Sequence, residues 1–381
     1  MNYLNAVTEL LSELVAINSI NPDLVPGGAG EGNIGRFVTN WLRAYGLQVE
    51  TQEVRPDRHN IIGIAKGSGG GRTLMLNGHM DTVGVAGMTN PLIPRTVGQR
   101  MYGRGAYDMK CGLAAAMVAA AAAAKQPLGG DVLVTAVVDE EFAGLGTMEI
   151  VKQYHADAAI VAEPTEMQAI IAHKGFVWLD IETHGVAAHG SRPDLGVDAI
   201  AHMGRVLTEL QTLDQQLRAN PTHPILKSGS LHCSLITGGQ ELSSYPERCV
   251  VSVERRTIPG ETPEIVEAQV RELLQRLSAA DPALRASVRR GLDRSPMGTD
   301  ADLPIVQILS QHSAAITGQA LQTAGVPYWT DAATLASAGI PAILFGPIGA
   351  GAHAVEEWVD LHTVAQCVEI YLAVAQDFCT A

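Results

Sequence analysis

The chain has 381 residues, which is more than one hydrophobic core usually supports, so its length favours two domains or one domain interrupted by another. Its composition, with 46% apolar and 17% charged residues, is typical of a folded globular protein and excludes disordered and fibrous structure. The formal net charge of −14 argues against nucleic acid and anionic membranes as partners.

The cysteines and the apolar segments bear on the compartment of the protein. Five cysteines are scattered without CxxC spacing, so we expect neither a disulfide framework nor a thiolate metal site, and a cytoplasmic location fits. The Met1–Ile20 segment contains Glu9 and Glu13, and it is expected to form an amphipathic helix and not a signal peptide. The longest apolar run, Leu113–Ala124, is mostly alanine and too short to span a bilayer, so we expect a buried helix there.

The first part of the chain alternates helix-period and strand-period segments, as an α/β architecture requires. Helices are predicted at Tyr3–Ile17, Gly32–Ala44, Met109–Lys125 and Gly144–Tyr154. Strands are predicted at Leu47–Val54, Asn60–Ala65, Thr73–Asn77, Asp131–Val138 and Ala158–Ala162. Because these strands are almost continuously hydrophobic, we expect a central, mostly parallel sheet flanked by helices.

The pattern changes at about Gly175. The predicted elements there are a strand, a helix, two strands, a helix and a strand, at Phe176–Thr183, Val197–Leu213, Ser230–Ile236, Cys249–Thr257, Pro263–Leu277 and Leu284–Arg290. This βαββαβ order predicts an inserted α+β domain of the split-βαβ, ferredoxin-like kind. After Pro296 the α/β pattern returns, with a helix, a second helix, a strand and a last helix at Leu303–Ile316, Asp331–Ala338, Ala342–Phe345 and Leu361–Phe378. The sequence thus predicts an α/β domain in two parts, residues 1–174 and 293–381, around an insert at 175–292.

Polar residues follow the predicted strands. His79 and Asp81 lie in the segment Asn77-Gly78-His79-Met80-Asp81, where a strand ends. Ligand sites in open α/β sheets gather at the carboxyl ends of strands. A metal-binding imidazole usually has a carboxylate that orients it, and Asp81 can accept the second ring proton of His79. A turn histidine with a capping aspartate remains the alternative for this motif alone.

Carboxylates occupy three further positions of this kind. Asp108 ends the glycine-punctuated loop before the alanine-rich helix, where it could cap that helix or bridge two metal ions. Glu140 and Glu141 follow a buried strand in Asp139-Glu140-Glu141, where adjacent acids repel one another unless cations neutralise them or solvent screens them. Glu163 follows another apolar strand.

One more histidine, His353, lies in the glycine-rich loop after the last predicted strand. Two histidines and several carboxylates without thiolates suit a catalytic and not a structural zinc site. Their number fits two ions with a bridging carboxylate and a water molecule. Two such ions, about 3.5–4 Å apart, polarise a carbonyl and generate hydroxide at neutral pH.

These motifs, in this order, resemble the two-zinc family that contains acetylornithine deacetylase, succinyl-diaminopimelate desuccinylase, aminoacylase-1 and the glutamate carboxypeptidases. The resemblance covers nearly the whole chain. It implies that His79 and Glu163 bind one zinc ion, that Glu141 and His353 bind the other, and that Asp108 bridges them. Asp81 would then orient His79, and Glu140 would be the general acid/base. Co²⁺ or Mn²⁺ could replace Zn²⁺.

The resemblance also implies roles within the insert, which would serve as a lid and as the dimerisation domain of a homodimer. His189, in Ala188-His189-Gly190-Ser191, would stabilise the oxyanion in cis or from the partner subunit; its alternative is a surface loop histidine. Arg256 matches an arginine that binds a substrate carboxylate. Glu254 and Ser243 depart from the family pattern, where aspartate and asparagine are common, and this leaves the substrate open.

Several functions are compatible with these residues. The leading hypothesis is an N-acyl-amino-acid deacylase of the acetylornithine deacetylase type, and the nearest alternative is a dipeptidase or carboxypeptidase with the same site. A non-catalytic paralogue that binds a small acid or a partner protein would be expected to lack a ligand or the base, and none is missing. A nucleophilic mechanism through Ser191 or a cysteine is disfavoured because no GxSxG motif accompanies either.

Overall fold

The computed structural model describes residues 2–380 and divides into two compact units. Unit 1 comprises the residues up to Ile171, Thr299–Ala324 and the residues from Thr330 onward. Unit 2 comprises Ala172–Gly298 and Gly325–Trp329. Among the described residues, no helix combines the length and the apolar character that a membrane crossing needs.

A mixed sheet, most of whose strands belong to unit 1, has the strand order β1-β2-β6-β3-β7-β15-β8-β13, with β14 beside β8. The bounds are β1 Gln48–Arg55, β2 Arg58–Ala65, β3 Leu74–His79, β6 Val132–Val137, β7 Ala158–Val161, β8 Ala169–His173, β13 Met297–Gly298, β14 Thr323–Val326 and β15 Ala342–Leu344. The pairings β3–β6, β3–β7 and β7–β15 are parallel, whereas β1–β2 and β2–β6 are antiparallel. The parallel centre therefore brings the carboxyl ends of β3, β6 and β7 to one edge of the sheet.

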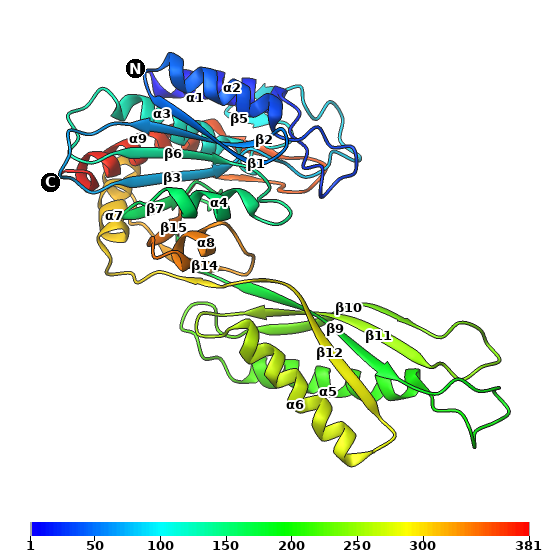
Figure 1. Ribbon diagram of the computed structural model, residues 1–381. Coiled ribbons are helices and arrows are strands. Elements are labelled where there is room, and N and C mark those ends of the chain that lie inside the picture. The colour runs from blue at the N-terminus through cyan, green and yellow to red at the C-terminus, as the bar shows by residue number, and fades with distance from the viewer. Residues whose placement is uncertain (1, 381) are drawn as a thin grey trace. The chain divides into compact units, whose positions relative to one another are not determined.

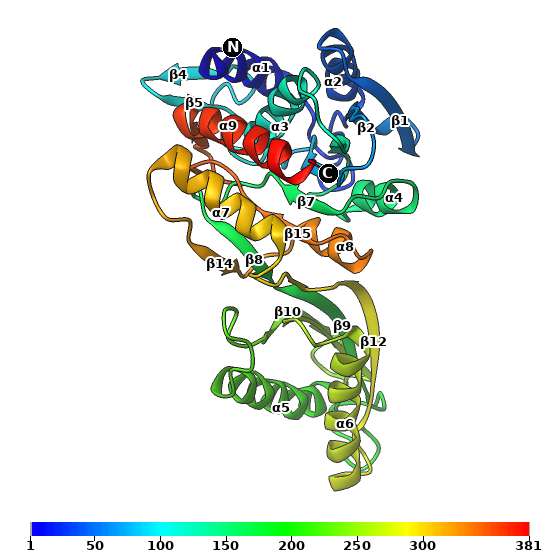
Figure 2. The same cartoon turned by 90° about the vertical axis from the view of Figure 1, so that its left-hand side faces the viewer.

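Helices cover this sheet on both faces (Figure 1). Their bounds are α1 Tyr3–Ala16, α2 Gly32–Ala44, α3 Lys110–Ala123, α4 Leu145–Gln153, α7 Pro304–Thr317, α8 Ala332–Ser337 and α9 Leu361–Phe378. The helix α3 lies against α1, α9 and the strands β3 and β6, and Figure 2 shows α3 and α9 side by side. A helix that is apolar on every side belongs in a protein interior, and every residue of α3 is buried.

Small residues let α3 approach the sheet closely. A Cβ atom on Gly112 would lie 1.7 Å from the carbonyl oxygen of Ala162, so the helix backbone nearly touches the chain just after β7. Alanine supplies most of the remaining positions, and it is also the strongest helix former. The helix that follows Asp108 is therefore packed directly beside the strand end that carries Glu163.

A second, small sheet joins two loops of unit 1. Its strand order is β16-β17-β5-β4, with bounds β16 Gly349–Ala350, β17 Trp358–Asp360, β5 Arg100–Tyr102 and β4 Arg95–Val97. The antiparallel pairing of β5 with β17 places the segment before Asp108 next to the segment after His353.

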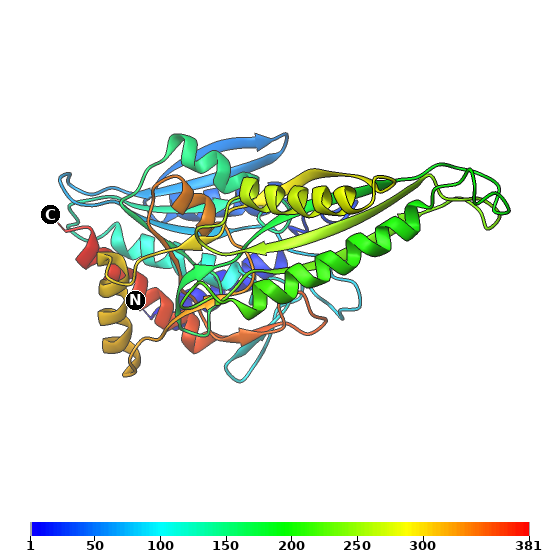
Figure 3. The same cartoon turned by 90° about the horizontal axis from the view of Figure 1, so that it is seen from below.

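Unit 2 has the element order β9-α5-β10-β11-α6-β12. The bounds are β9 Gly175–His184, α5 Ala199–Ala219, β10 Ser230–Gly238, β11 Arg248–Thr257, α6 Pro263–Ala280 and β12 Arg285–Arg294. Its strands form an antiparallel sheet in the order β10-β11-β9-β12. Both helices lie on one face of this sheet and run along its strands (Figures 1 and 3), and their buried residues form the core of the unit.

The structure differs from the sequence-based prediction in two respects. The helix α5 continues to Ala219, six residues beyond its predicted end at Leu213. The short strands β4, β5, β8, β13, β14, β16 and β17 were not predicted, because strands of two to five residues carry too little periodicity to be recognised. A lid or dimerisation role for unit 2 stays a prediction.

Candidate metal centre

His79 is the last residue of β3, a strand that is buried along its whole length. Its Nδ1 lies 3.0 Å from the backbone oxygen of Asp81 and 3.6 Å from the Oδ1 atom of that residue. The nearer partner of the ring is thus the carbonyl of Asp81 and not its carboxylate. Both partners draw a proton to Nδ1, and this leaves Nε2 available as a ligand atom.

The first candidate metal-binding group consists of His79, Asp108 and Glu163, whose ligand atoms lie within 4.8 Å of one another. The Nε2 atom of His79 lies 3.3 Å from Oδ1 of Asp108 and 3.7 Å from Oε1 of Glu163. His79 ends β3 and Glu163 follows β7, and these two strands are parallel neighbours. The sheet edge therefore brings the two side chains together.

The second candidate group consists of Asp108, Glu141 and His353. The Nε2 atom of His353 lies 3.3 Å from Oδ2 of Asp108 and 3.1 Å from Oε2 of Glu141. Asp108 belongs to both groups and turns a different oxygen to each histidine. The side chain of His353 is 57% exposed, whereas that of His79 is 1% exposed, so the second group is the more open one.

Asp108 does not act as a helix cap. The N-cap residue of α3 is Met109, and within the described part of the chain it makes no side-chain capping hydrogen bond. The alternative reading of Asp108 as a cap is thus wrong, because its carboxylate points to the two histidines instead.

The charges of this cluster fit a cation. Burial, followed by the charge of Asp108, raises the pKa of Glu163 to about 8 and the pKa of Glu141 to about 7. Hydrogen bonds to Asp108 and Glu141 raise the pKa of His353 to about 10. Buried carboxylates that repel one another are stabilised by a positive charge between them.

Two orphaned atoms point to the same conclusion. Among the described residues, neither Nε2 of His79 nor Oε1 of Glu141 has a hydrogen-bond partner, although both are buried. Buried polar atoms are normally paired, and a bound ion is one of the accepted explanations for an exception. Carboxylates and imidazoles in these numbers suit zinc, and they fit one ion in each group.

Glu140 lies beside the first group without belonging to it. Its Oε2 is 3.9 Å from Nε2 of His79, and its side chain is 11% exposed. Burial, opposed by the charge of His79, raises the pKa of Glu140 well above its usual value. A carboxyl group with a raised pKa next to a cation site can hold and release a proton near neutral pH.

Asp81 does more than contact His79. Its Oδ1 accepts the backbone N–H of Glu140, and its Oδ2 accepts that of Glu141, at 3.2 Å each. The carboxylate thereby fixes the start of the segment after β6 relative to the end of β3.

Sequence reasoning missed residues that support this centre from a distance. They are the buried polar side chains Asn21, Glu31, Arg58, Arg104 and Glu357. Their side-chain partners lie between 27 and 253 positions away along the chain, so no local motif connects them. Glu357 alone carried a signal, since it stands four residues after His353 in the same motif.

The predicted residues of the insert, His189 and Arg256, belong to unit 2. The Nδ1 atom of His189 lies 2.8 Å from Oγ of Ser191, on an exposed segment. Arg256 forms an ion pair with Glu254 at 2.6 Å, and its guanidinium lies 5.5 Å from the ring centre of Phe176. Both side chains are within reach of solvent, and their roles stay predictions.

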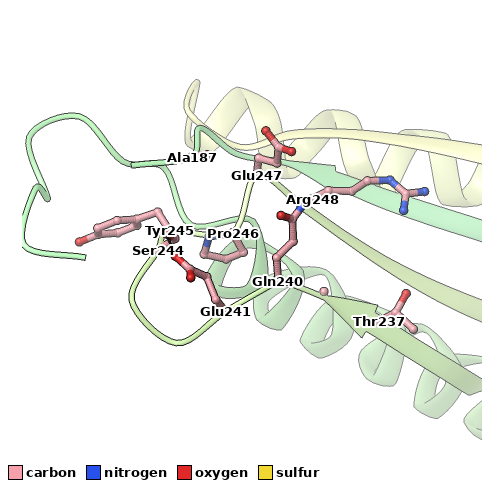
Figure 4. Close-up of a pocket in the computed structure, with 11 residues that line it drawn as sticks. Ala187, Thr237, Gln240, Glu241, Ser244, Tyr245, Pro246, Glu247 and Arg248 are labelled. Carbon is pink, nitrogen blue, oxygen red and sulfur yellow. Dashed lines mark hydrogen bonds between the residues drawn. The ribbon is translucent and has the colours of Figure 1, made fainter. Parts of the chain in front are cut away.

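Unit 2 also contains an open pocket of about 290 Å³ between the end of β10 and the start of β11. Figure 4 shows that Glu241, Ser244 and Tyr245 line it from the connecting loop, next to Arg248. The lining does not include His189 or Arg256.

The chain is similar in sequence to characterised enzymes over nearly its whole length. The profile of peptidase family M20/M25/M40 matches residues 75–377. The acetylornithine deacetylase of Myxococcus xanthus is 31% identical, over 99% of this chain and 98% of the relative. An N-formyl-4-amino-5-aminomethyl-2-methylpyrimidine deformylase of Bacillus subtilis is 26% identical, over 98% of this chain and 95% of the relative.

Solved structures share the fold at lower sequence identity. An aminopeptidase from Bacillus cereus superposes with a TM-score of 0.81 at 16% identity, over 98% of each chain. A dinuclear metal-binding peptidase of the M20 family from Bacillus subtilis superposes with a TM-score of 0.78 at 15% identity, over 99% of this chain and 98% of that one.

Proposed function

The chain belongs to peptidase family M20/M25/M40, whose members hydrolyse amide and peptide C–N bonds, and on this basis we propose that it is a two-zinc deacylase of N-acyl amino acids. The observation that carries the proposal is the position of Asp108, which turns one oxygen to His79 and the other to His353 at 3.3 Å each. A carboxylate shared in this way is the bridge that a pair of ions requires.

In the proposed centre, His79 and Glu163 hold one ion, Glu141 and His353 hold the other, and Asp108 binds both. Such a pair of ions, when bound, polarises the scissile carbonyl and lowers the pKa of a water molecule. The proximity of all five side chains at one sheet edge supports this assignment. Zn²⁺ is the proposed metal, and Co²⁺ or Mn²⁺ would fit the same oxygen and nitrogen ligands.

Glu140 is the proposed general acid/base. It lies close enough to the first group to take a proton from the attacking water and to deliver it to the leaving nitrogen. Its raised pKa lets the carboxyl group keep that proton until the C–N bond breaks. Asp81 contributes by orienting His79 and by holding the backbone of Glu140.

His189 and Arg256 would meet the substrate itself. His189 would donate to the oxyanion, in cis or from the partner subunit of a homodimer, and Arg256 would bind a substrate carboxylate through its guanidinium fork. The exposure of both side chains supports contact with a ligand. A monomer in light scattering with full activity would exclude a role of His189 in trans.

The substrate class is supported by the full-length similarity to an acetylornithine deacetylase. Purified, zinc-loaded protein should be assayed with N-acetyl, N-succinyl and N-formyl amino acids and, in parallel, with unblocked dipeptides. Turnover of acylated amino acids is expected. Turnover of dipeptides alone would reject the deacylase and establish the alternative, a dipeptidase or carboxypeptidase with the same centre.

A further inference from the structure

Glu357 places a buried carboxylate against the backbone of the loop that carries Asp108. Its Oε1 accepts the N–H groups of Tyr107 and Asp108 at 2.8 and 3.0 Å, and its Oε2 accepts that of Gly105 at 3.1 Å. The side chain of Glu357 is fully buried. Three backbone donors from one loop thus converge on a single carboxylate, which fixes the loop in one conformation.

Arg104, on the loop of Asp108, adds two further contacts to the loop of His353. Its Nη1 donates to Oε2 of Glu357 at 2.5 Å, and its Nη2 donates to the backbone oxygen of Ala354 at 3.0 Å. Ala354 directly follows His353 in the chain. The guanidinium therefore joins the loop of Asp108 to the loop of His353, and its own side chain is 3% exposed.

The two loops carry ligand atoms of both candidate groups. Asp108 contributes to both groups, and His353 contributes to the second one. Glu357 and Arg104 lie outside both groups, so they act on the ligands through the backbone. Metal affinity depends on such outer contacts, and removing one typically lowers it about 10- to 100-fold.

We propose that Glu357 and Arg104 are positioning residues that fix the bridging ligand Asp108 and the ligand His353 relative to each other. The buried ion pair of Glu357 and Arg104, called the clamp below, would thereby support the binding of both ions. The proposal rests on the two-metal function argued above. In this proposal the ion pair of Arg104 and Glu357, which are 253 positions apart in the sequence, sets the spacing between the loop of Asp108 and the loop of His353.

The substitution Glu357→Gln tests the clamp with little change of shape. The amide group of glutamine keeps one acceptor oxygen, but its NH₂ group would face donors in either orientation. In one orientation these are the N–H group of Gly105 and the guanidinium of Arg104, and in the other they are the N–H groups of Tyr107 and Asp108. We expect the dissociation constant for zinc to rise about 10- to 100-fold. The rise should be larger for the group that contains His353, because both of its loops lose their anchor.

The measurement is a zinc titration of metal-free protein against a chromophoric chelator, at a temperature where circular dichroism shows each variant folded. Glu356→Gln is the matched control, because Glu356 is exposed and adjacent in sequence. Arg104→Lys is a second variant, which keeps the positive charge but loses the fork that reaches Ala354. Arg104→Lys should weaken zinc binding in the group that contains His353 more than zinc binding in the other group.

Equal zinc affinities in wild type, Glu357→Gln and Arg104→Lys would overturn the clamp, even if Glu357→Gln had a lower melting temperature. If Glu357→Gln fails to fold, the zinc affinity of Arg104→Lys relative to that of the wild type decides. The number of zinc ions bound by the wild type tests the proposed two-metal function. The ratio of variant to wild-type zinc affinity tests the clamp separately, whatever that number is.

Discussion

Asn21 donates a hydrogen bond from Nδ2 to Oδ2 of Asp81 at 2.8 Å, across 60 positions of sequence. The same Nδ2 donates to Oδ1 of Asp139 at 3.1 Å. Both carboxylates are fully buried, and Asp139 directly precedes Glu140 and Glu141. One amide group therefore holds Asp81 and the segment with the proposed general base in a fixed relation.

We expect Asn21→Ala to lower kcat about 10- to 100-fold, as the loss of an outer contact of a metal centre does, with a smaller change in KM. The variant frees the Asp81 carboxylate, which lies 3.6 Å from Nδ1 of His79 and accepts the backbone N–H groups of Glu140 and Glu141. Steady-state kinetics under zinc saturation measure this. Asn33→Ala is the control, since Asn33 is exposed and bonds to Arg36. Equal kcat values in Asn21→Ala and the control would contradict the role of Asn21.

Arg58 is the cation of the same buried network. It forms ion pairs with Asp23, Glu31 and Asp139 at 2.5, 2.6 and 3.0 Å, and its side chain is 8% exposed. Removing the cation leaves buried carboxylates without compensation, so Arg58→Gln should lower the free energy of unfolding by about 3–5 kcal/mol.

Urea unfolding of Arg58→Gln measures this loss, with Arg55→Gln as the control. Arg55 also pairs with Asp23, at 2.9 Å, but its side chain is 47% exposed. Exposed pairs contribute at most about 1 kcal/mol, so the control should unfold close to the wild type. Similar losses of unfolding free energy in both variants would show that the burial of Arg58 does not determine its contribution to stability.

Glu140→Ala separates proton transfer from metal binding. Because Glu140 lies next to the first group and is not a member of it, the variant should keep its zinc and lose about 10²- to 10⁴-fold in turnover. His79→Ala should instead lose zinc. Metal analysis of the two variants after gel filtration, beside kcat measurements, distinguishes them. A Glu140→Ala protein with wild-type turnover would remove the general base from the mechanism.

The stability of the metal-free protein should depend on pH. Burial, followed by the charge of Asp108, raises the pKa of Glu163 to about 8 and that of Glu141 to about 7. A raised carboxyl pKa means that the folded chain binds the proton more tightly than the unfolded chain, so stability falls as pH rises through these values. His353, with its pKa raised to about 10, adds stability that is complete below about pH 6.5 and lost on the alkaline side.

The melting temperature measured in a chelator should therefore fall between about pH 6 and pH 9. Excess zinc should remove or reverse this trend, because metal binding needs deprotonated ligands and strengthens as pH rises. A metal-free protein whose melting temperature stays constant or rises across this range would show that the cluster does not titrate in the way described.

Much of the centre could be foreseen from the sequence, because its side chains stand where apolar strands end. His79, Glu141 and Glu163 each lie at or just after the end of a strand, and the parallel pairing of those strands follows from their continuous hydrophobicity. Adjacent acids and a histidine are visible in a short stretch of sequence.

The supporting residues could not be foreseen, because burial and long-range pairing give them their role. Asn21, Arg58 and Arg104 stand in unremarkable local sequence, and only the folded chain shows that each is enclosed and which carboxylate it meets. The short strands β5 and β17, which align the two ligand loops, have three residues each and no distinctive periodicity.

The helix α3 begins two residues after Asp108 and has all of its residues buried. Amide hydrogens exchange with solvent when a segment opens, and a fully enclosed helix opens at a cost close to that of global unfolding. The amide protons of α3 should thus be among the slowest to exchange in unit 1. Asp108, the proposed bridge, is therefore attached to one of the least mobile segments of the chain, so the distance between the two proposed ions would change little during turnover.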